Sequence, residues 1–252
     1  MTTIAIGGGE LNLRDNLPFY RMIVKMTQKS KPDALFVPTA SNDNPQHYKV
    51  FKEIFGEKLG CDTNQILLMG EQPMAADVIK EKIENADIVF VGPGNSLMMM
   101  RRLRHLKVAP LLRKASRRGA IMAGIGAGAS CWFEFGHSDA MSFYDEKEKG
   151  NWKFLRVKCL GIVDRIMLSP YYNNKERQQD LEQMVYRLGT TAIGLPEKMA
   201  MVVQDGRYKL FTNNTKEQAY KIYKLRGKSV SVPIEVSDNW RPLGQLLSKP
   251  LV

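Results

Sequence analysis

The chain has 252 residues, of which 44% are hydrophobic and 25% charged, and its formal net charge is +11. This length allows one substantial core or two small ones, and the composition is typical of a globular protein. No apolar run approaches the roughly 20 residues that span a bilayer, so no membrane association is expected. Residues 1–7 lack a basic segment followed by a long apolar core, and we expect no signal peptide.

Three cysteines lie far apart in the sequence, at Cys61, Cys131 and Cys159. Their spacing fits neither a disulfide framework nor a zinc site, so we expect no metal and no cofactor. Free cysteines of this kind favour a reducing compartment, and the cytoplasm is the expected location.

Positive charge is densest between residues 101 and 118, which hold eight Lys or Arg side chains and no acid. Such a run is either a polyanion site or the solvated face of two helices. No aromatic stacking pattern or nucleic-acid motif accompanies it, so the sequence favours the solvated face and no nucleic-acid partner. A basic polyanion-binding protein stays open as an alternative function.

Strands and helices alternate along the first half of the chain. The alternation predicts a parallel sheet with helices on both faces, which is a three-layer α/β/α fold. Asn44 followed by Pro45 is typical of a helix start, because the side chain caps and proline suits the first turn. The expected strands are residues 3–6, 34–37, 65–69, 88–91 and 120–123. The expected helices begin near residues 16, 45 and 75, and two short ones end near residue 118.

Four of these strands end in loops of small residues, at 7–10, 39–43, 92–96 and 124–128. Ligands of open α/β folds bind outside the carboxyl ends of the strands. We therefore expect the four loops to converge on one cleft.

The second half of the chain is richer in strands. Strands are expected at residues 160–163, 165–168, 191–194, 199–203 and 207–211, with a helix at 175–187. No low-complexity linker and no internal repeat is visible, so residues 1–252 are interpreted as a single domain.

Residues 119–132 are the most informative stretch. A short apolar run is followed by glycines at 124, 126 and 128, and Ala129 to Phe133 then resemble the start of a buried helix. Strand, tight turn and helix is the layout of a nucleophile elbow, which reads Gly-x-Ser-x-Gly. Here the apex is Gly126, which has no side chain. Because the apex of an elbow is strained, we expect Gly126 to have a positive φ.

These motifs together resemble peptidase E, the aspartyl dipeptidase family of serine peptidases. The resemblance runs from Ile4 to about Phe211, and the stretch after about Lys224 matches nothing. It implies a fold like that of class I glutamine amidotransferases, which is flavodoxin-like. The segments that carry it are Gly7–Glu10, Phe36–Ser41, Gly94-Asn95, the elbow with Cys131–Glu134, Gly136–Asp139 and Ser169–Asn173.

The resemblance also implies where a catalytic triad would lie. The serine position holds Gly126, the histidine position holds Tyr171, and the acid falls at Glu197. The Gly-Gly-Asn near the oxyanion site is Pro93-Gly94-Asn95 here, so one backbone N–H is missing. The residues expected around the oxyanion and the ligand are Gly94, Asn95, Ala127, Gly8, His137 and Arg177.

A serine hydroxyl attacks only when a base removes its proton, and a tyrosine is a poor base at neutral pH. We therefore interpret the chain as a peptidase E-like protein without hydrolytic activity. It is expected to bind a small peptide or an acidic small molecule, as a monomer or homodimer.

An active hydrolase with unconventional groups is the main alternative, for example a dipeptidase that uses Cys131 or a water held by Glu197 and Tyr171. Two ligand residues also stay open. His137 is expected in a loop, where it contacts the ligand or bonds only its neighbours. Arg177 contacts an acidic ligand or lies on a helix surface.

Overall fold

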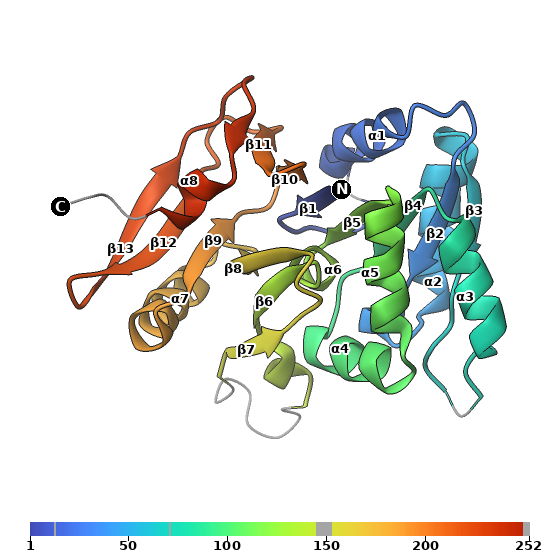
Figure 1. The fold of residues 1–252 in the computed structure, drawn as a ribbon, viewed down its shortest axis with the longest axis horizontal. Coiled ribbons are helices and arrows are strands. Elements are labelled where there is room, and N and C mark those ends of the chain that lie inside the picture. The colour runs from blue at the N-terminus through green and yellow to red at the C-terminus, as the bar shows by residue number, and fades with distance from the viewer. Residues whose placement is uncertain (13, 71, 145–152, 249–252) are drawn as a thin grey trace.

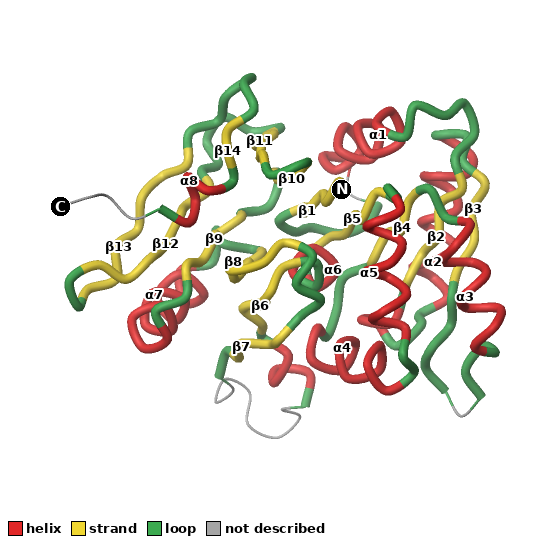
Figure 2. Tube along the Cα trace, viewed as in Figure 1, coloured by secondary structure: helices red, strands yellow, loops and turns green. Residues whose placement is uncertain are grey.

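The computed structural model describes residues 1–12, 14–70, 72–144 and 153–248. Its strands form two sheets, and most of the helices surround the larger one (Figure 1). The path of the chain through helices and strands can be followed in Figure 2.

The larger sheet has eight strands in the described part of the chain, and its centre is parallel. The three strands at one end join it in antiparallel pairs. In spatial order the strands are β14 (Arg241–Pro242), β11 (Arg207–Thr212), β10 (Met199–Gln204), β1 (Thr2–Ile6), β5 (Ile121–Ile125), β4 (Ile88–Val91), β2 (Asp33–Val37) and β3 (Asp62–Gln65).

Helices cover both faces of this sheet, as the alternating pattern predicts, and the three-layer α/β/α arrangement is confirmed. Ile4 and Ile6 of β1 pack on one side, while Ala5 between them packs on the other, because successive strand residues face opposite sides. The first side is covered by α1 (Leu17–Met26), α2 (Pro45–Phe51) and η3 (Lys52–Lys58). The second is covered by α3 (Ala76–Asn85), α4 (Ser96–His105) and α5 (Val108–Arg118).

Asparagine side chains start three of the helices. Asn44 accepts a hydrogen bond from the backbone N–H of Gln46 at 2.9 Å, so the helix start expected at Asn44-Pro45 is confirmed. Asn95 caps α4 in the same way, and Asn174 caps α7 (Lys175–Leu188). Each cap satisfies a backbone donor that the first turn of a helix leaves without a partner.

The second sheet has six strands in the described residues, and the sequence did not predict it as a separate sheet. One of its faces packs into the core that it shares with the larger sheet, and α7 covers the other. In spatial order its strands are β13 (Lys228–Ile234), β12 (Ala219–Leu225), β9 (Thr191–Leu195), β8 (Val163–Pro170), β6 (Phe133–Ser138) and β7 (Leu155–Lys158).

Several expected elements differ in their limits. The helix after the elbow, α6 (Ala127–Ser130), is short, and Phe133 already starts β6. His137 therefore lies in a strand, so its expected place in a loop is wrong. The third strand ends at Gln65 instead of beginning there, and β8 is one strand where two were expected. The limits of a strand depend on its pairing with strands that are distant in the sequence, and a local sequence pattern does not reveal that pairing.

The remaining elements are the short segments η1 (Arg14–Asn16), η2 (Thr39–Ser41), η4 (Ala140–Phe143) and α8 (Gly244–Leu247). The last of these, α8, is tied to the second sheet by Lys221 of β12. Lys221 is buried and donates from Nζ to the carbonyl oxygens of Gln245 at 3.0 Å and of Ser248.

Candidate functional site

The elbow at Gly126 joins β5 to α6. Gly126 has φ 58° and ψ −116°, so the expected positive φ is confirmed. Its carbonyl oxygen accepts hydrogen bonds from the backbone N–H groups of Ala129 at 3.0 Å and Ser130 at 3.1 Å. The flanking glycines are required by packing: a Cβ on Gly124 would lie 2.3 Å from the carbonyl oxygen of Gly128.

The ring of Tyr171 lies directly against this elbow. A Cβ built on Gly126 would lie 2.9 Å from the Tyr171 hydroxyl oxygen and 3.0 Å from its Cε2. A Cβ built on Gly8 would lie 2.5 Å from the same ring. Tyr171 itself has φ 54°, and its backbone N–H donates to the carbonyl oxygen of Gly7 at 2.6 Å. The ring therefore fills the space between the loop after β1 and the apex of the elbow.

Glu197 lies on the far side of that ring. Its Cγ is 3.0 Å from a Cβ built on Gly8, and its Oε2 accepts a 3.3 Å hydrogen bond from the side chain of Asn173. Burial, followed by the charge of Glu197, raises the pKa of Tyr171 to about 12. The phenol is therefore neutral at pH 7 and is a weak proton acceptor.

Gly94 and Asn95 form the wall opposite the elbow. Gly94 has φ 135°, and a Cβ on it would lie 2.1 Å from the carbonyl oxygen of Ala40. The buried Asn95 uses both ends of its amide: Oδ1 accepts from the backbone N–H of Met98 at 2.9 Å, and Nδ2 donates to the carbonyl oxygen of Ala140 at 3.3 Å. Asn95 thus holds α4 and η4 together.

Ala127 begins the first turn of α6, where backbone N–H groups have no partner inside the helix. It lines a small cavity together with Gly94. Gly94 and Ala127 thus bring backbone from two loops to the wall of one cavity.

His137 forms a buried chain of hydrogen bonds behind the site. Its Nδ1 lies 2.9 Å from Ser169 Oγ, and its Nε2 lies 2.9 Å from Asp180 Oδ1. Burial lowers the pKa of His137, although the bond to Asp180 opposes this shift. The Ser–His–Asp order resembles a catalytic triad, but Ser169 is fully buried and does not line the cleft. Both ring nitrogens of His137 are used within the protein.

Arg177 is buried, with 4% of its surface exposed, and is therefore not a helix-surface residue. Its guanidinium pairs with Asp139 at 2.6 Å and donates to the carbonyl oxygen of His137 at 3.2 Å. It also lies over the rings of Phe154 at 4.8 Å and Tyr171 at 5.9 Å. Its charge is therefore already balanced by a carboxylate of the same chain.

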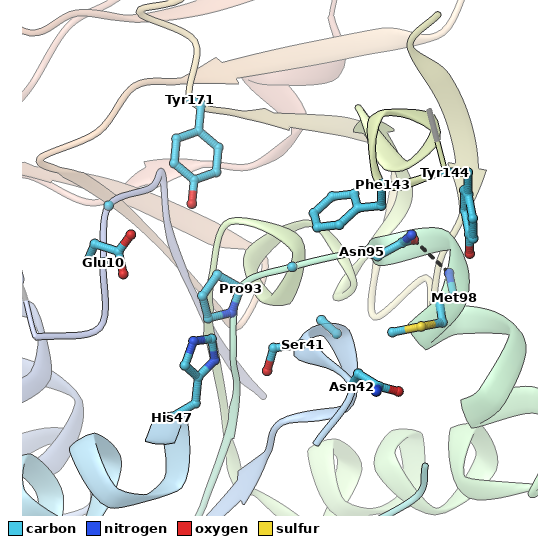
Figure 3. Close-up of a pocket in the computed structure, with 13 residues that line it drawn as sticks. Glu10, Ser41, Asn42, His47, Pro93, Asn95, Met98, Phe143, Tyr144 and Tyr171 are labelled. Atoms are coloured by element: carbon cyan, nitrogen blue, oxygen red, sulfur yellow. Dashed lines mark hydrogen bonds between the residues drawn. The ribbon is translucent and has the colours of Figure 1, made fainter. Parts of the chain in front are cut away.

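Two cavities lie along this constellation and share Gly94, Phe143 and Tyr171. The larger has a volume of about 510 Å³ (Figure 3), and the smaller, beside Arg177, about 160 Å³. Gly94 and Tyr171 line both, while Gly8 and Gly126 contact the Tyr171 ring, so the expected convergence on one cleft is confirmed. Glu10 and Asn42 come from loops that were expected at the cleft, whereas the sequence did not single out His47, Met98, Phe143 and Tyr144, which also line it.

Ser130 and Cys131, which follow the apex of the elbow, are buried and hydrogen-bonded to the backbone. Cys131 is fully buried, its Sγ donates to the carbonyl oxygen of Gly128 at 3.1 Å, and burial raises its pKa well above the ordinary value. Ser130 donates to the carbonyl oxygen of Ala127 at 3.0 Å. A thiol held in its neutral form is a poor nucleophile.

Several side chains of the basic stretch 101–118 bind the protein itself. Arg113 donates to the carbonyl oxygen of Leu160 at 2.7 Å, and Arg118 donates to that of Ala86 at 2.8 Å. Arg102 and Arg104 donate to further backbone carbonyls, and Lys114 pairs with Glu84 at 2.8 Å. These arginines connect α4 and α5 to the backbone of neighbouring segments by hydrogen bonds.

Within residues 1–12, 14–70, 72–144 and 153–248, no cluster of His, Cys, Asp or Glu has the make-up of a metal site. None of the helices in this part of the chain is both long and apolar enough to cross a membrane.

Comparison with known proteins gives a consistent picture. The sequence model of peptidase family S51 matches residues 3–211. The chain is 25% identical over 236 residues to the uncharacterized peptidase YgaJ of Bacillus subtilis strain 168, covering 92% of this chain and 96% of that protein.

Two crystal structures share the fold. One is a peptidase from an acI-B1 Actinobacterium, with a TM-score of 0.71, 14% identity and 96% of each chain covered. The other is a putative peptidase E protein from Listeria monocytogenes EGD-e, with a TM-score of 0.62 and 16% identity, covering 84% of this chain and 98% of the other.

Proposed function

Because the chain belongs to peptidase family S51, we propose that it is a pseudoenzyme, which binds a small peptide or an acidic small molecule in the family's cleft without hydrolysing it. The proposal includes the roles of the site residues. Gly126, Tyr171 and Glu197 stand where the resemblance expects serine, histidine and acid.

One observation carries this proposal: the Tyr171 ring occupies the space into which a side chain at position 126 would extend. The elbow thus has no nucleophile, and a side chain at its apex would require the Tyr171 ring to shift. Its neighbour is a neutral phenol in place of an imidazole, so the apex lacks a base at the histidine position. Covalent catalysis at the apex needs both groups.

The cleft nevertheless keeps features of a binding site. A cavity of about 510 Å³ is within the range of small-molecule sites, and its lining combines apolar side chains with a few polar groups. The unpaired N–H at the start of α6 can still bind an oxygen of the ligand.

The alternative functions have less support. Hydrolysis through Cys131 would need a thiolate, and burial disfavours it. Polyanion binding would need free cations, whereas Arg102, Arg104, Arg113 and Arg118 donate to backbone carbonyls.

The test is a panel of dipeptides, including Asp-Xaa sequences, assayed for binding by thermal shift and for hydrolysis by mass spectrometry. We expect at least one peptide to raise the melting temperature, because a ligand of the native state stabilises it by mass action, and to be recovered intact. Steady release of amino acids by the purified protein would contradict the proposal.

A further inference from the structure

The larger cavity has a polar end and an apolar end, which come from different elements (Figure 3). At the polar end, the carboxylate of Glu10, the hydroxyl of Tyr171 and the imidazole of His47 face a common space. Glu10 follows β1, and His47 lies in α2. At the other end, Met98 of α4 lies beside the aromatic side chains of Phe143 and Tyr144, of which Phe143 is 55% exposed.

The three polar groups have open hydrogen-bonding capacity. Within the described residues, no hydrogen bond satisfies the Glu10 carboxylate, the Tyr171 hydroxyl or either ring nitrogen of His47, and His47 Nδ1 is buried without a partner. A carboxylate accepts hydrogen bonds, while a neutral imidazole and a phenol can each accept one as well. Each of the two neutral groups also carries one donor, the imidazole N–H and the phenol O–H, so the set combines one carboxylate with two groups that can each accept a hydrogen bond.

The charge at this end is negative. Among the described residues that line the cavity, Glu10 has the only carboxylate, and no Lys or Arg lines it. Burial lowers the pKa of His47, and the pKa of Tyr171 is raised to about 12, so both are neutral at pH 7. The charge of Glu10 acts on both groups, in keeping with their common orientation.

Arg177, which lines the smaller cavity, is not available to the larger one. Asp139 pairs with its guanidinium at 2.6 Å. An acidic ligand in the larger cavity would meet Glu10 without a compensating positive charge, and like charges repel.

We propose that the larger cavity selects an organic ammonium ion: an amine attached to an apolar or aromatic group. The ammonium donates to Glu10 and to the acceptors of His47 and Tyr171, while the apolar group packs against Met98 and Phe143. This inference rests on the proposed function and refines it, since it favours a ligand with a free amine over an acidic metabolite.

Three probes of similar size test the charge preference by calorimetry at pH 7: 2-phenylethylamine, its neutral N-acetyl derivative and the anion 3-phenylpropanoate. We expect the amine to bind about tenfold or more tightly than either of the others, because hydrogen bonds between charged partners are the stronger ones. Equal or tighter binding of the anion or the neutral amide would overturn the inference, and so would the absence of binding by all three.

Two variants test the placement. Glu10→Gln is expected to weaken binding of 2-phenylethylamine about tenfold while leaving the neutral amide unchanged. The matched control is Glu57→Gln, which removes an exposed carboxylate of η3 outside the cavity and should change neither affinity. Unchanged amine affinity in Glu10→Gln would contradict the placement.

The dipeptide panel separates this inference from the proposed function. Tight binding of 3-phenylpropanoate with every dipeptide recovered intact would refute the amine preference and leave the pseudoenzyme proposal standing. Hydrolysis of a dipeptide would refute the pseudoenzyme proposal whatever the order of the three probes.

Discussion

At the scale of single residues, Gly126 and Tyr171 fit each other. Gly126 tolerates φ 58° without steric cost, and it leaves room for the ring that lies on it. Together the two residues form a packed contact at the two positions where the resemblance expects a nucleophile and a base. The two positions are therefore expected to be energetically coupled.

We predict that Gly126→Ser lowers the free energy of unfolding by about 1–3 kcal/mol, because the side chain is strained at positive φ and meets the Tyr171 ring. Gly189→Ser is the matched control, since Gly189 has φ 70° with no atom within 4 Å of an added Cβ. Each substitution is made in the original protein and in the Tyr171→Ala variant, and denaturant melts give the free energies of unfolding. The cost of Gly126→Ser should depend on the residue at position 171, whereas the cost of Gly189→Ser should not. A Gly126→Ser protein as stable as the original would show that the contact is not tight.

His137 gives a prediction of pH dependence. Its pKa in the folded protein is lowered, first by burial, so the unfolded chain binds more protons near pH 6.5. Stability should therefore fall as the pH drops below about 6.5. His137→Gln is expected to flatten this fall in denaturant melts between pH 5 and 7.5, while His105→Gln, on an exposed part of α4, should not. The idea fails if His137→Gln leaves the slope unchanged.

At the scale of elements, the site depends on how helix starts join neighbouring loops. Asn95 caps α4 and also bonds Ala140 in η4, which carries Phe143 at the wall shared by both cavities. Asn44 caps α2, but its side chain has no such second bond among the contacts of the described residues. Comparing substitutions of the two asparagines therefore separates the effect of capping a helix from the effect of a hydrogen bond between two elements.

We predict that Asn44→Ala costs about 1 kcal/mol of stability and Asn95→Ala about 2 kcal/mol, since the second substitution also leaves a buried carbonyl unpaired. Asn95→Ala should in addition speed hydrogen exchange at the backbone amides of η4, measured by mass spectrometry. Equal costs for the two substitutions, with η4 exchange unchanged, would contradict the role given to Asn95.

At the scale of the whole molecule, alternation in the sequence was enough to predict the parallel part of the larger sheet, but not that antiparallel strands join its end. Residues 2–6, 33–37, 88–91 and 121–125 are buried throughout or nearly so, as expected for central parallel strands. The second sheet was missed because β6 contains glycine and histidine and resembles a loop. It becomes a strand by pairing with β7 and with β8, which lies some thirty residues further on.

The candidate site was likewise predictable in part. The elbow and its missing nucleophile follow from the glycine pattern, and the importance of Tyr171 follows from the resemblance. Glu10 lies in a loop that was expected at the cleft, whereas His47 was missed because it lies in α2, and only the fold brings that helix beside the loop after β1. One signal was available: α2 follows the loop at 39–43, which was also expected at the cleft.

The single-domain interpretation remains a prediction, which one hydrophobic core extending from the larger sheet into the second supports. We expect one unfolding transition, with far-ultraviolet and near-ultraviolet circular dichroism changing at the same denaturant concentration. The buried Trp132, in this core between the two sheets, supplies a fluorescence probe that should coincide with both. Two separated transitions would indicate that the sheets belong to independent units.

The loss of covalent catalysis is the central claim, and labelling by a serine-directed fluorophosphonate tests it most directly. Such a reagent forms a stable adduct only with a hydroxyl that a base activates. Intact-mass spectrometry should find the protein unmodified under conditions that fully label an active serine peptidase. A stoichiometric adduct mapped to any residue near Gly126 would contradict the account.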